Sequence, residues 1–280
     1  MERMHEHHDH THHQAVTPTV ENSAAFLLPH LTSSMEILDV GCGAGNITLG
    51  LARHIESLGG KANQVQGVDV SEEALNTARS HAADAGLAVN FITGSAESLP
   101  MPDNSVDVAY ASQSLHHMDD PIAALRELAR VVRPGGLIAA RELDFGTQTW
   151  YPPSPGMSRW RAVFTVIAEL DGLHTTSGRQ LLSWFHRASL SDANFSSSTW
   201  SYASTEDRRG MADVWIDRMS GEEYARKAAE ALGDVREDGT PGDLAREAIK
   251  QGQDGWNKWA STPGAIFVMP HFEVIARVSQ

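Results

Sequence analysis

The sequence predicts an α/β fold built around a mostly parallel sheet, and two segments carry that prediction. The first is an apolar run at 37–40 that contains Asp39 and leads into alternating glycines at 41, 43 and 45. The second is an apolar run that ends in Val68 and Asp69. We interpret them as a buried strand, a loop without side chains, a helix start, and a second strand with a carboxylate at its tip. Ligands bind outside the carboxyl ends of parallel strands, so the pattern predicts a site for an adenosine-bearing cofactor.

The spacing of the glycines distinguishes between two classes of cofactor. A dinucleotide-binding loop, G-x-G-x-x-G, would need a glycine at position 46, where this chain has Asn46. The stretch instead resembles motif I of the class I S-adenosyl-L-methionine (SAM)-dependent methyltransferases, D-x-G-x-G-x-G, matched at Asp39, Gly41, Gly43 and Gly45. This spacing disfavours a nicotinamide-dependent oxidoreductase.

Three later segments extend the resemblance in the family's order, so that it covers about residues 35–142. They are the second strand at 65–69, a strand and turn at 90–100, and a block with a strand at 105–112, two histidines and an R-P-G-G turn at 133–136. The resemblance is strongest to the UbiE-like (methyltransferase type 11) group, which mostly methylates small molecules. It implies a Rossmann-like class I methyltransferase fold with a seven-stranded, mostly parallel sheet and helices on both faces.

The resemblance also implies which residues hold SAM. The Asp69 carboxylate would accept both ribose hydroxyls, an arrangement that suits a charged, two-oxygen acceptor. The turn after the third strand would contact the adenine, the end of the fourth strand the methionine portion, and Asp39 would organise the loop or a water near the ammonium. The expected cofactor-binding residues are Asp39, Gly41, Gly43, Gly45, Asp69, Val70, Ala96, Glu97, Ser112 and Gln113.

Methyl transfer asks little of protein side chains, because it is an in-line displacement that depends on proximity, alignment and a desolvated site. A general base helps only when the nucleophile must lose a proton. The candidates are His117 and His116, with His117 slightly ahead, and the alternative is that they only start a helix or pack. Glu142 and Asp144 follow the fifth strand at the ligand edge but cannot be ranked. No metal site is expected.

The elements after the fifth strand follow from periodicity and breaks. Apolar residues on one face indicate a helix over 158–170, after three prolines that force an irregular crossing. The remaining expected elements are a helix at 179–188, a strand at 196–203, helical segments at 206–232 and 243–259, and a last strand from 264 to 276.

We expect three parts of the chain. Residues 1–30 form a tail and a lid helix, 31–145 form the SAM-binding core, and 146–280 complete the sheet and add substrate-facing helices. Between the last two strands, an insertion at about 206–260 would cap the substrate pocket, and its alternative is a dimerisation or solvent-facing excursion.

Two further features have competing interpretations. Six histidines lie between His5 and His13, which indicates a solvated tail or a metal-binding tract. A helix from His13 and Gln14 to His30 would form the lid, and either of the first two residues could touch the cofactor. All seven tryptophans follow residue 145, where they supply either pocket surface or ordinary core.

The composition of the chain argues against several classes of binding partner. A formal net charge of −14 argues against a nucleic-acid substrate. The single cysteine, Cys42, excludes an intramolecular disulfide and is interpreted as packing. No apolar run is long enough for a membrane span and no secretory signal is evident, so we expect a cytoplasmic protein that does not bind membranes. A homodimer is a further possibility.

The leading hypothesis is a SAM-dependent methyltransferase that acts on an oxygen, carbon or nitrogen nucleophile of a small aromatic or apolar metabolite. The alternatives are a SAM-binding protein that does not methylate or is regulatory, and a methyltransferase that acts on proteins. The sequence does not identify the acceptor.

Overall fold

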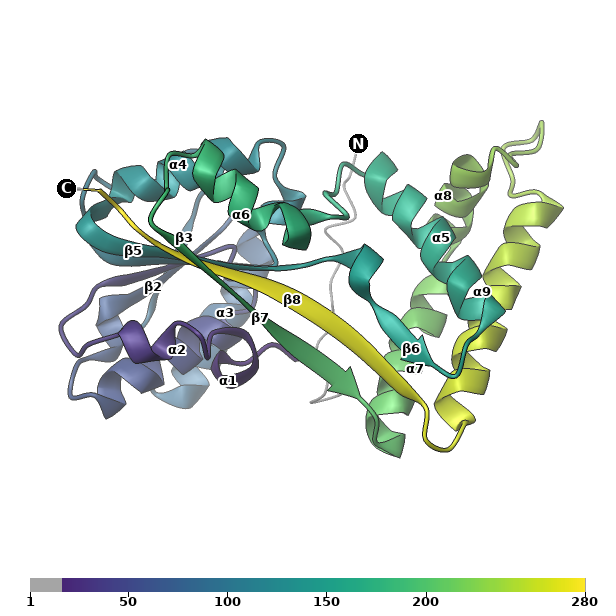
Figure 1. Ribbon diagram of the computed structural model, residues 1–280, viewed down its shortest axis with the longest axis horizontal. Coiled ribbons are helices and arrows are strands. Elements are labelled where there is room, and N and C mark those ends of the chain that lie inside the picture. Colours follow the sequence, from purple (N-terminus) through teal and green to yellow (C-terminus); the bar gives the residue numbers. More distant parts are fainter. Residues whose placement is uncertain (1–16, 280) are drawn as a thin grey trace. The chain divides into compact units, whose positions relative to one another are not determined.

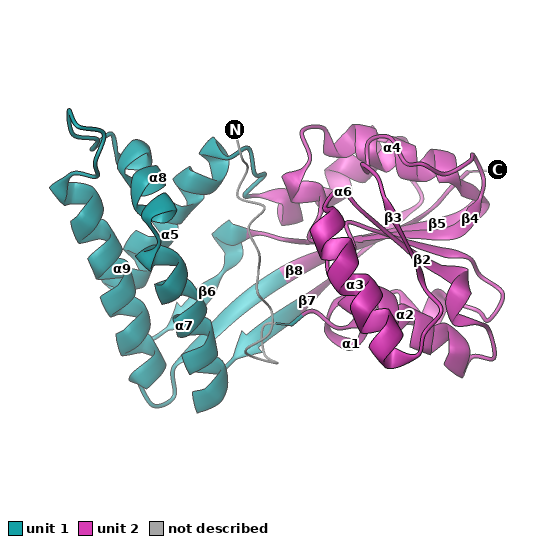
Figure 2. Cartoon of the chain, turned by 180° about the vertical axis from the view of Figure 1, so that it is seen from behind, with its two compact units in different colours: residues 1–17, 145–175, 199–270 teal, residues 18–144, 176–198, 271–280 magenta. Residues whose placement is uncertain are grey.

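The computed structural model describes residues 17–279, and within them the chain forms two units (Figure 2). Unit 1 comprises Thr17, 145–175 and 199–270. Unit 2 comprises 18–144, 176–198 and the segment from 271 onward. Strands β7 (Ala193–Tyr202) and β8 (Ile266–Arg277) each contribute residues to both units.

Unit 2 contains the parallel sheet that the sequence predicts. Its strands lie in the order β3-β2-β1-β4-β5-β8, with β7 paired to β8. The first five are parallel, whereas β8 runs antiparallel to β5. The strands not yet placed are β1 (Ile37–Val40), β2 (Val65–Asp69), β3 (Asn90–Thr93), β4 (Val106–Ser112) and β5 (Val132–Leu143).

Helices cover both faces of this sheet because successive strand residues point to opposite sides (Figure 1). Leu38 and Ala109 join the core under α4 and α6, whereas Ile37 and Val108 join the core under α1 and α2. The helices of unit 2 are α1 (Val20–Ser23), α2 (Asn46–Ser57), α3 (Glu72–Ala85), α4 (Pro121–Val131) and α6 (Ser177–Arg187), with short 3₁₀ turns at Leu28–His30, Ala62–Gln64 and Leu115–His117.

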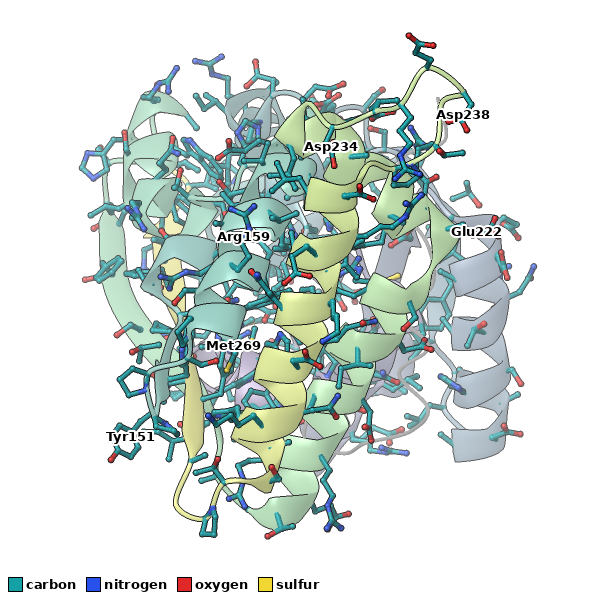
Figure 3. All side chains as sticks on the ribbon, turned by 90° about the vertical axis from the view of Figure 1, so that its right-hand side faces the viewer. Tyr151, Arg159, Glu222, Asp234, Asp238 and Met269 are labelled. Carbon is teal, nitrogen blue, oxygen red and sulfur yellow. The ribbon has the colours of Figure 1, made fainter. Side chains whose placement is uncertain are left out.

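Unit 1 is a helical layer on a short piece of sheet. Strand β6 (Thr149–Tyr151) pairs antiparallel with the start of β8, where Trp150 lies opposite Phe267. In Figure 3, Tyr151 lies at one end of the layer, and Asp234 and Asp238 lie on a loop at the other end. The elements of the layer are a 3₁₀ turn at Phe145–Thr147 and the helices α5 (Pro155–Leu170), α7 (Thr205–Ser220), α8 (Glu222–Leu232) and α9 (Asp243–Ser261).

Most of the late tryptophans form the core of unit 1. Trp160, Trp256 and Trp259 are each no more than 1% exposed. The ring centroids of Trp160 and Trp256 are 4.8 Å apart, and those of Trp160 and Trp215 are 4.5 Å apart, in edge-to-face arrangements. Trp184 lies in the core of unit 2 instead. The packing interpretation therefore accounts for much of the aromatic enrichment.

The structure corrects two expectations about local elements. The lid helix expected to run to His30 is, in its described part, the single turn α1 followed by a 3₁₀ turn. The helix ends after Ser23 because Ala24 leaves the helical backbone, with φ of −123° and ψ of 9°. His13, Gln14 and the histidine tract lie outside the described residues. The second correction is β6, which precedes the prolines and adds one strand to the expected seven.

The closest helix contact in unit 1 gives a stability test. A Cβ on Gly156 of α5 would stand 2.2 Å from the main-chain oxygen of Gln251 on α9. We expect Gly156→Ala to force the helices apart at a cost of about 1–3 kcal/mol. The melting temperature should fall by about 2–10 °C. Gly221→Ala is the control, because its nearest atom, the Arg218 oxygen, is 3.5 Å away. Equal melting temperatures for the two variants would contradict this packing.

Candidate functional site

The three glycines after β1 all adopt left-handed backbone, with φ of 73° at Gly41, 51° at Gly43 and 80° at Gly45. Side-chain-bearing residues rarely adopt this conformation. A Cβ on Gly41 would lie 2.5 Å from Ser114 Cβ, and one on Gly45 would lie 2.9 Å from Ala78 Cβ. In contrast, nothing lies within 4 Å of the Cβ position of Gly43. Two glycines therefore press the loop against its neighbours, and the middle one leaves open space for a ligand.

Asp69, at the end of β2, is fixed by the same loop. Its Oδ2 accepts the Gly43 N–H at 2.9 Å, and its Oδ1 accepts the Ser71 N–H at 2.9 Å. A carboxylate has about four lone-pair positions, so each oxygen can accept a second hydrogen bond. This carboxylate is thus oriented beside the open glycine, where a ribose would need it.

Asp39 supports the loop from inside the sheet. The carboxylate is 2% exposed, and its Oδ2 accepts the Thr48 hydroxyl of α2 at 2.6 Å. Burial raises the pKa of Asp39 to about 7, although the Thr48 hydrogen bond lowers it, and the nearby Asp69 charge raises it further. Burial likewise raises the pKa of the Cys42 thiol, which keeps it protonated. Cys42 Sγ also lies against Gly67, which agrees with a packing role.

The residues expected near the adenine have different surroundings. Val70 follows Asp69 and is 61% exposed, which leaves an apolar surface beside the carboxylate. Ala96 is buried and belongs to the core under α4. The Glu97 side chain accepts the Asp120 N–H at 3.1 Å, at the start of α4. Ala96 therefore packs in the core and Glu97 supports the start of α4, whereas the Val70 side chain is left exposed beside Asp69.

The end of β4 lies directly behind the glycine loop. The Ser114 hydroxyl donates to the Val40 oxygen at 3.2 Å, and the Ser114 side chain fills the space beside Gly41. Gln113 has a left-handed φ of 50°, and its N–H donates to the Arg141 oxygen at 2.8 Å. The Ser112 hydroxyl is buried beside the Tyr110 side chain. Such a buried hydroxyl fits a polar ligand at this strand end.

Glu142 of β5 holds the loop after β4 in place. The residue is 0% exposed. Its Oε1 accepts the N–H groups of Ser114 at 3.0 Å and Leu115 at 2.8 Å, and its Oε2 lies 2.6 Å from Nδ1 of His116. The ring of His117 packs against that of His116 at a tilt of 38°, with centroids 4.1 Å apart. A single buried carboxylate thus fixes both the backbone and one histidine of the loop.

From the sequence, Glu142 was a candidate site residue with nothing to rank it above Asp144. The structural roles of Ser114 and Thr48 were not predicted. The signal for Glu142 is an acid that follows the apolar run Leu137–Ala140 of a buried strand. The signal is weak, because Asp144 in the same segment instead forms a salt bridge with Arg179 at 2.6 Å. Only the register of β5 against β4 shows which acid reaches the loop.

The donor set fits the adenosine and amino-acid groups of SAM. Four features of unit 2 make up this set: the open face at Gly43, the oriented Asp69 carboxylate, the exposed Val70 and the buried Ser112 hydroxyl.

In residues 17–279, no helix is both long and apolar enough to cross a membrane.

The raised pKa of Asp39 predicts a pH effect on the ligand-free protein. The folded state keeps a proton on Asp39 up to pH about 7, whereas the unfolded chain loses it near pH 4. The stabilisation from this proton is complete below about pH 4 and is lost as the pH rises through about 7. Asp39→Asn has no proton to lose, so its melting temperature should rise relative to wild type between pH 5 and 8. A difference that stays constant over this range, as expected for the exposed control Asp84→Asn, would contradict the assignment.

Comparisons with known proteins agree with this site. Residues 38–140 match the family model of a methyltransferase domain. The chain is 34% identical to an uncharacterized methyltransferase of Schizosaccharomyces pombe over 206 residues, 72% of this chain and 73% of the relative. It is 30% identical to a probable methyltransferase of Aspergillus luteorubrus over 279 residues, 93% and 91% of the two chains.

The expected resemblance to the UbiE-like group is confirmed as well. The quinone-biosynthesis C-methyltransferase UbiE of Chromobacterium violaceum is 32% identical over 120 residues, 43% of this chain and 46% of the relative. The crystal structure of YcgJ from Bacillus subtilis has the same fold, with a TM-score of 0.55, 18% identity, and coverage of 91% of this chain and 97% of that chain. On these grounds the chain belongs to the class I SAM-dependent methyltransferases, and SAM is its cofactor.

Proposed function

We propose that the enzyme methylates an oxygen, carbon or nitrogen nucleophile of a small aromatic or apolar molecule, with His116 as general base. The observation that carries this proposal is the 2.6 Å contact between His116 Nδ1 and the buried Glu142 carboxylate. His116 lies in the loop after β4, and Ser114 of the same loop packs against Gly41 of the glycine loop. A base of this kind is useful only for an acceptor that must lose a proton.

The contact determines which nitrogen of His116 can act. A carboxylate only accepts hydrogen bonds, so the proton of the neutral imidazole resides on Nδ1. Nε2 then carries the lone pair that removes a proton from the acceptor, and Glu142 stabilises the imidazolium that forms. The sequence favoured His117 slightly, and the Glu142 contact is the reason to propose His116 instead. His117 supports the His116 ring by packing against it.

Bound SAM supplies an activated methyl group on a sulfonium, so the protein's part is to align the acceptor and exclude water. We propose that the glycines of the loop, Asp69 and Val70 bind the adenosine portion. We further propose that Asp39, Ser112 and Gln113 bind or organise the methionine portion, and that Ala96 and Glu97 shape the adenine side through their backbone.

Two observations support a small acceptor. One relative carries out quinone-biosynthesis C-methylation, according to its name. The formal charge of −14 opposes binding to a phosphate backbone. The test supplies methyl-labelled SAM together with a metabolite extract separated into small-molecule and protein fractions. We expect the label to appear in the small-molecule fraction. Label in the protein fraction would favour a protein acceptor. If the enzyme binds SAM but transfers no label, the non-methylating alternative is favoured.

The cofactor site predicts the effect of removing one charge. Asp69→Asn loses the charge that strengthens hydrogen bonds to the ribose. We expect the Kd for S-adenosylhomocysteine, measured by calorimetry, to rise by about 10- to 100-fold, which corresponds to about 1.5–3 kcal/mol. Asp84→Asn, on the exposed face of α3, is the control and should bind as wild type does. An unchanged Kd in Asp69→Asn would remove Asp69 from the site.

The base assignment predicts a loss of turnover without a loss of binding. His116→Asn keeps a donor that can reach Glu142 but has no basic nitrogen. We expect kcat with the transferred acceptor to fall by about 100- to 10,000-fold, while the Kd for S-adenosylhomocysteine stays near that of wild type. His186→Asn, at an exposed position of α6, should leave both quantities unchanged. Wild-type kcat in His116→Asn would show that His116 is not the base.

A further inference from the structure

Arg218 of α7 is a half-buried cation in unit 1 without an acidic partner. Among residues 17–279, its guanidinium forms no hydrogen bond and no ion pair, and its described contacts are with aromatic rings. Other arginines of the same unit do pair with carboxylates. Arg226 lies 2.7 Å from Glu223, and Arg236 pairs with Asp243. Arg218 is therefore a positive charge that this unit leaves available.

Two aromatic rings hold the Arg218 guanidinium in place. Its Cζ lies 5.4 Å from the ring centroid of Trp215 and 5.6 Å from that of Phe164. Both rings are buried. Burial also lowers the pKa of Arg218, although nearby Tyr224 and Asp171 oppose this shift, and an arginine stays charged at neutral pH. A guanidinium that faces aromatic rings keeps its in-plane N–H groups for a planar anion.

The Tyr224 hydroxyl of α8 is a second donor beside this cation. Tyr224 is 4% exposed, and in the described part of the chain its hydroxyl has no hydrogen-bond partner. Burial raises the pKa of Tyr224, and the Arg218 charge opposes that rise, so the two side chains are close. The phenol stays protonated and can donate. Because buried tyrosine hydroxyls usually find a partner, the two donors together indicate an acceptor that binds from outside the chain.

The surroundings favour an acceptor with one negative charge. Asp171 of α5 is bound to a different cation, because its Oδ2 accepts from Nζ of Lys227 at 2.8 Å. Asp171 would repel a dianion more strongly than a monoanion. A carboxylate has two oxygens in one plane, which suits a guanidinium edge and a phenol. Val214 lies one turn before Arg218 on the same face of α7 and is 36% exposed, so the ligand has an apolar surface beside the charge.

We propose that Arg218 and Tyr224 form a binding site for the carboxylate of a small organic acid whose apolar part lies against Val214. All of these residues belong to unit 1. The site is defined without the SAM-binding residues of unit 2, and it adds a second ligand class to that of the cofactor.

The test uses benzoate, which joins one carboxylate to a small apolar body. Its Kd is measured by ligand-observed NMR titration of wild type, Arg218→Gln and Tyr224→Phe, after melting curves have shown that each variant is folded. Arg209→Gln makes the same change at an exposed position of α7 and is the matched control. Benzyl alcohol, which lacks the charge, and inorganic phosphate, which lacks the apolar body, are the comparison ligands.

We expect saturable binding of benzoate to wild type. The Kd should rise at least about tenfold in Arg218→Gln, because hydrogen bonds to a charged group are lost. It should rise at least about threefold in Tyr224→Phe, which removes one hydroxyl and keeps the ring, so this variant tests the site even if Arg218→Gln does not fold. Arg209→Gln should bind as wild type does, and both comparison ligands should bind more weakly than benzoate.

Four results would overturn the inference. The first is a lack of saturable benzoate binding to wild type, which would leave Arg218 with a packing role. The second is a wild-type Kd in either Arg218→Gln or Tyr224→Phe. Equal binding of benzyl alcohol would show that the charge is not recognised, and equal binding of phosphate would refute the carboxylate class. None of these measurements involves methyl transfer, so they leave the proposed function untouched.

Discussion

The structure of the site depends on the buried carboxylate of Glu142. A charge that is 0% exposed is tolerated only when it is well paired, and Glu142 achieves this with two backbone N–H groups and one imidazole. These bonds fix Ser114, which supports the glycine loop beside Gly41, and His116, the proposed base. The support of the cofactor loop and the orientation of the base therefore come from one interaction between β4 and β5.

The two units are stabilised by different kinds of side-chain interaction. In unit 2, acidic side chains at the carboxyl ends of β1, β2 and β5 already have hydrogen-bond partners: Asp39 accepts from the Thr48 hydroxyl, Asp69 from the Gly43 N–H, and Glu142 contacts His116. Unit 1 is held together by aromatic rings around Trp160 and Trp256. The tryptophan-rich composition after residue 145 thus reflects the need of a small helical unit for its own core.

Local patterns predicted much of this structure. The glycine loop and the acid at Asp69 could be identified because left-handed backbone and a strand-end carboxylate leave a signature within a few residues. The role of Glu142 could not, because it depends on the register between β4 and β5 and on burial, which are set by distant residues. Strand β6 is only three residues long and therefore shows no period. The short α1 reflects the departure of Ala24 from helical backbone, which the local pattern of the expected lid helix did not indicate.

The central claim is that Glu142 places the proton of His116 on Nδ1 and leaves Nε2 as the base. Nitrogen-15 NMR of the histidine side chains, with the His116 signals assigned by comparison with His116→Asn, tests it directly. When the ring is neutral, the account predicts a proton on Nδ1 and none on Nε2, and this preference should be lost in Glu142→Gln. A proton on Nε2 of the neutral ring in wild type would contradict the account, because that nitrogen could then not accept a proton from the methyl acceptor.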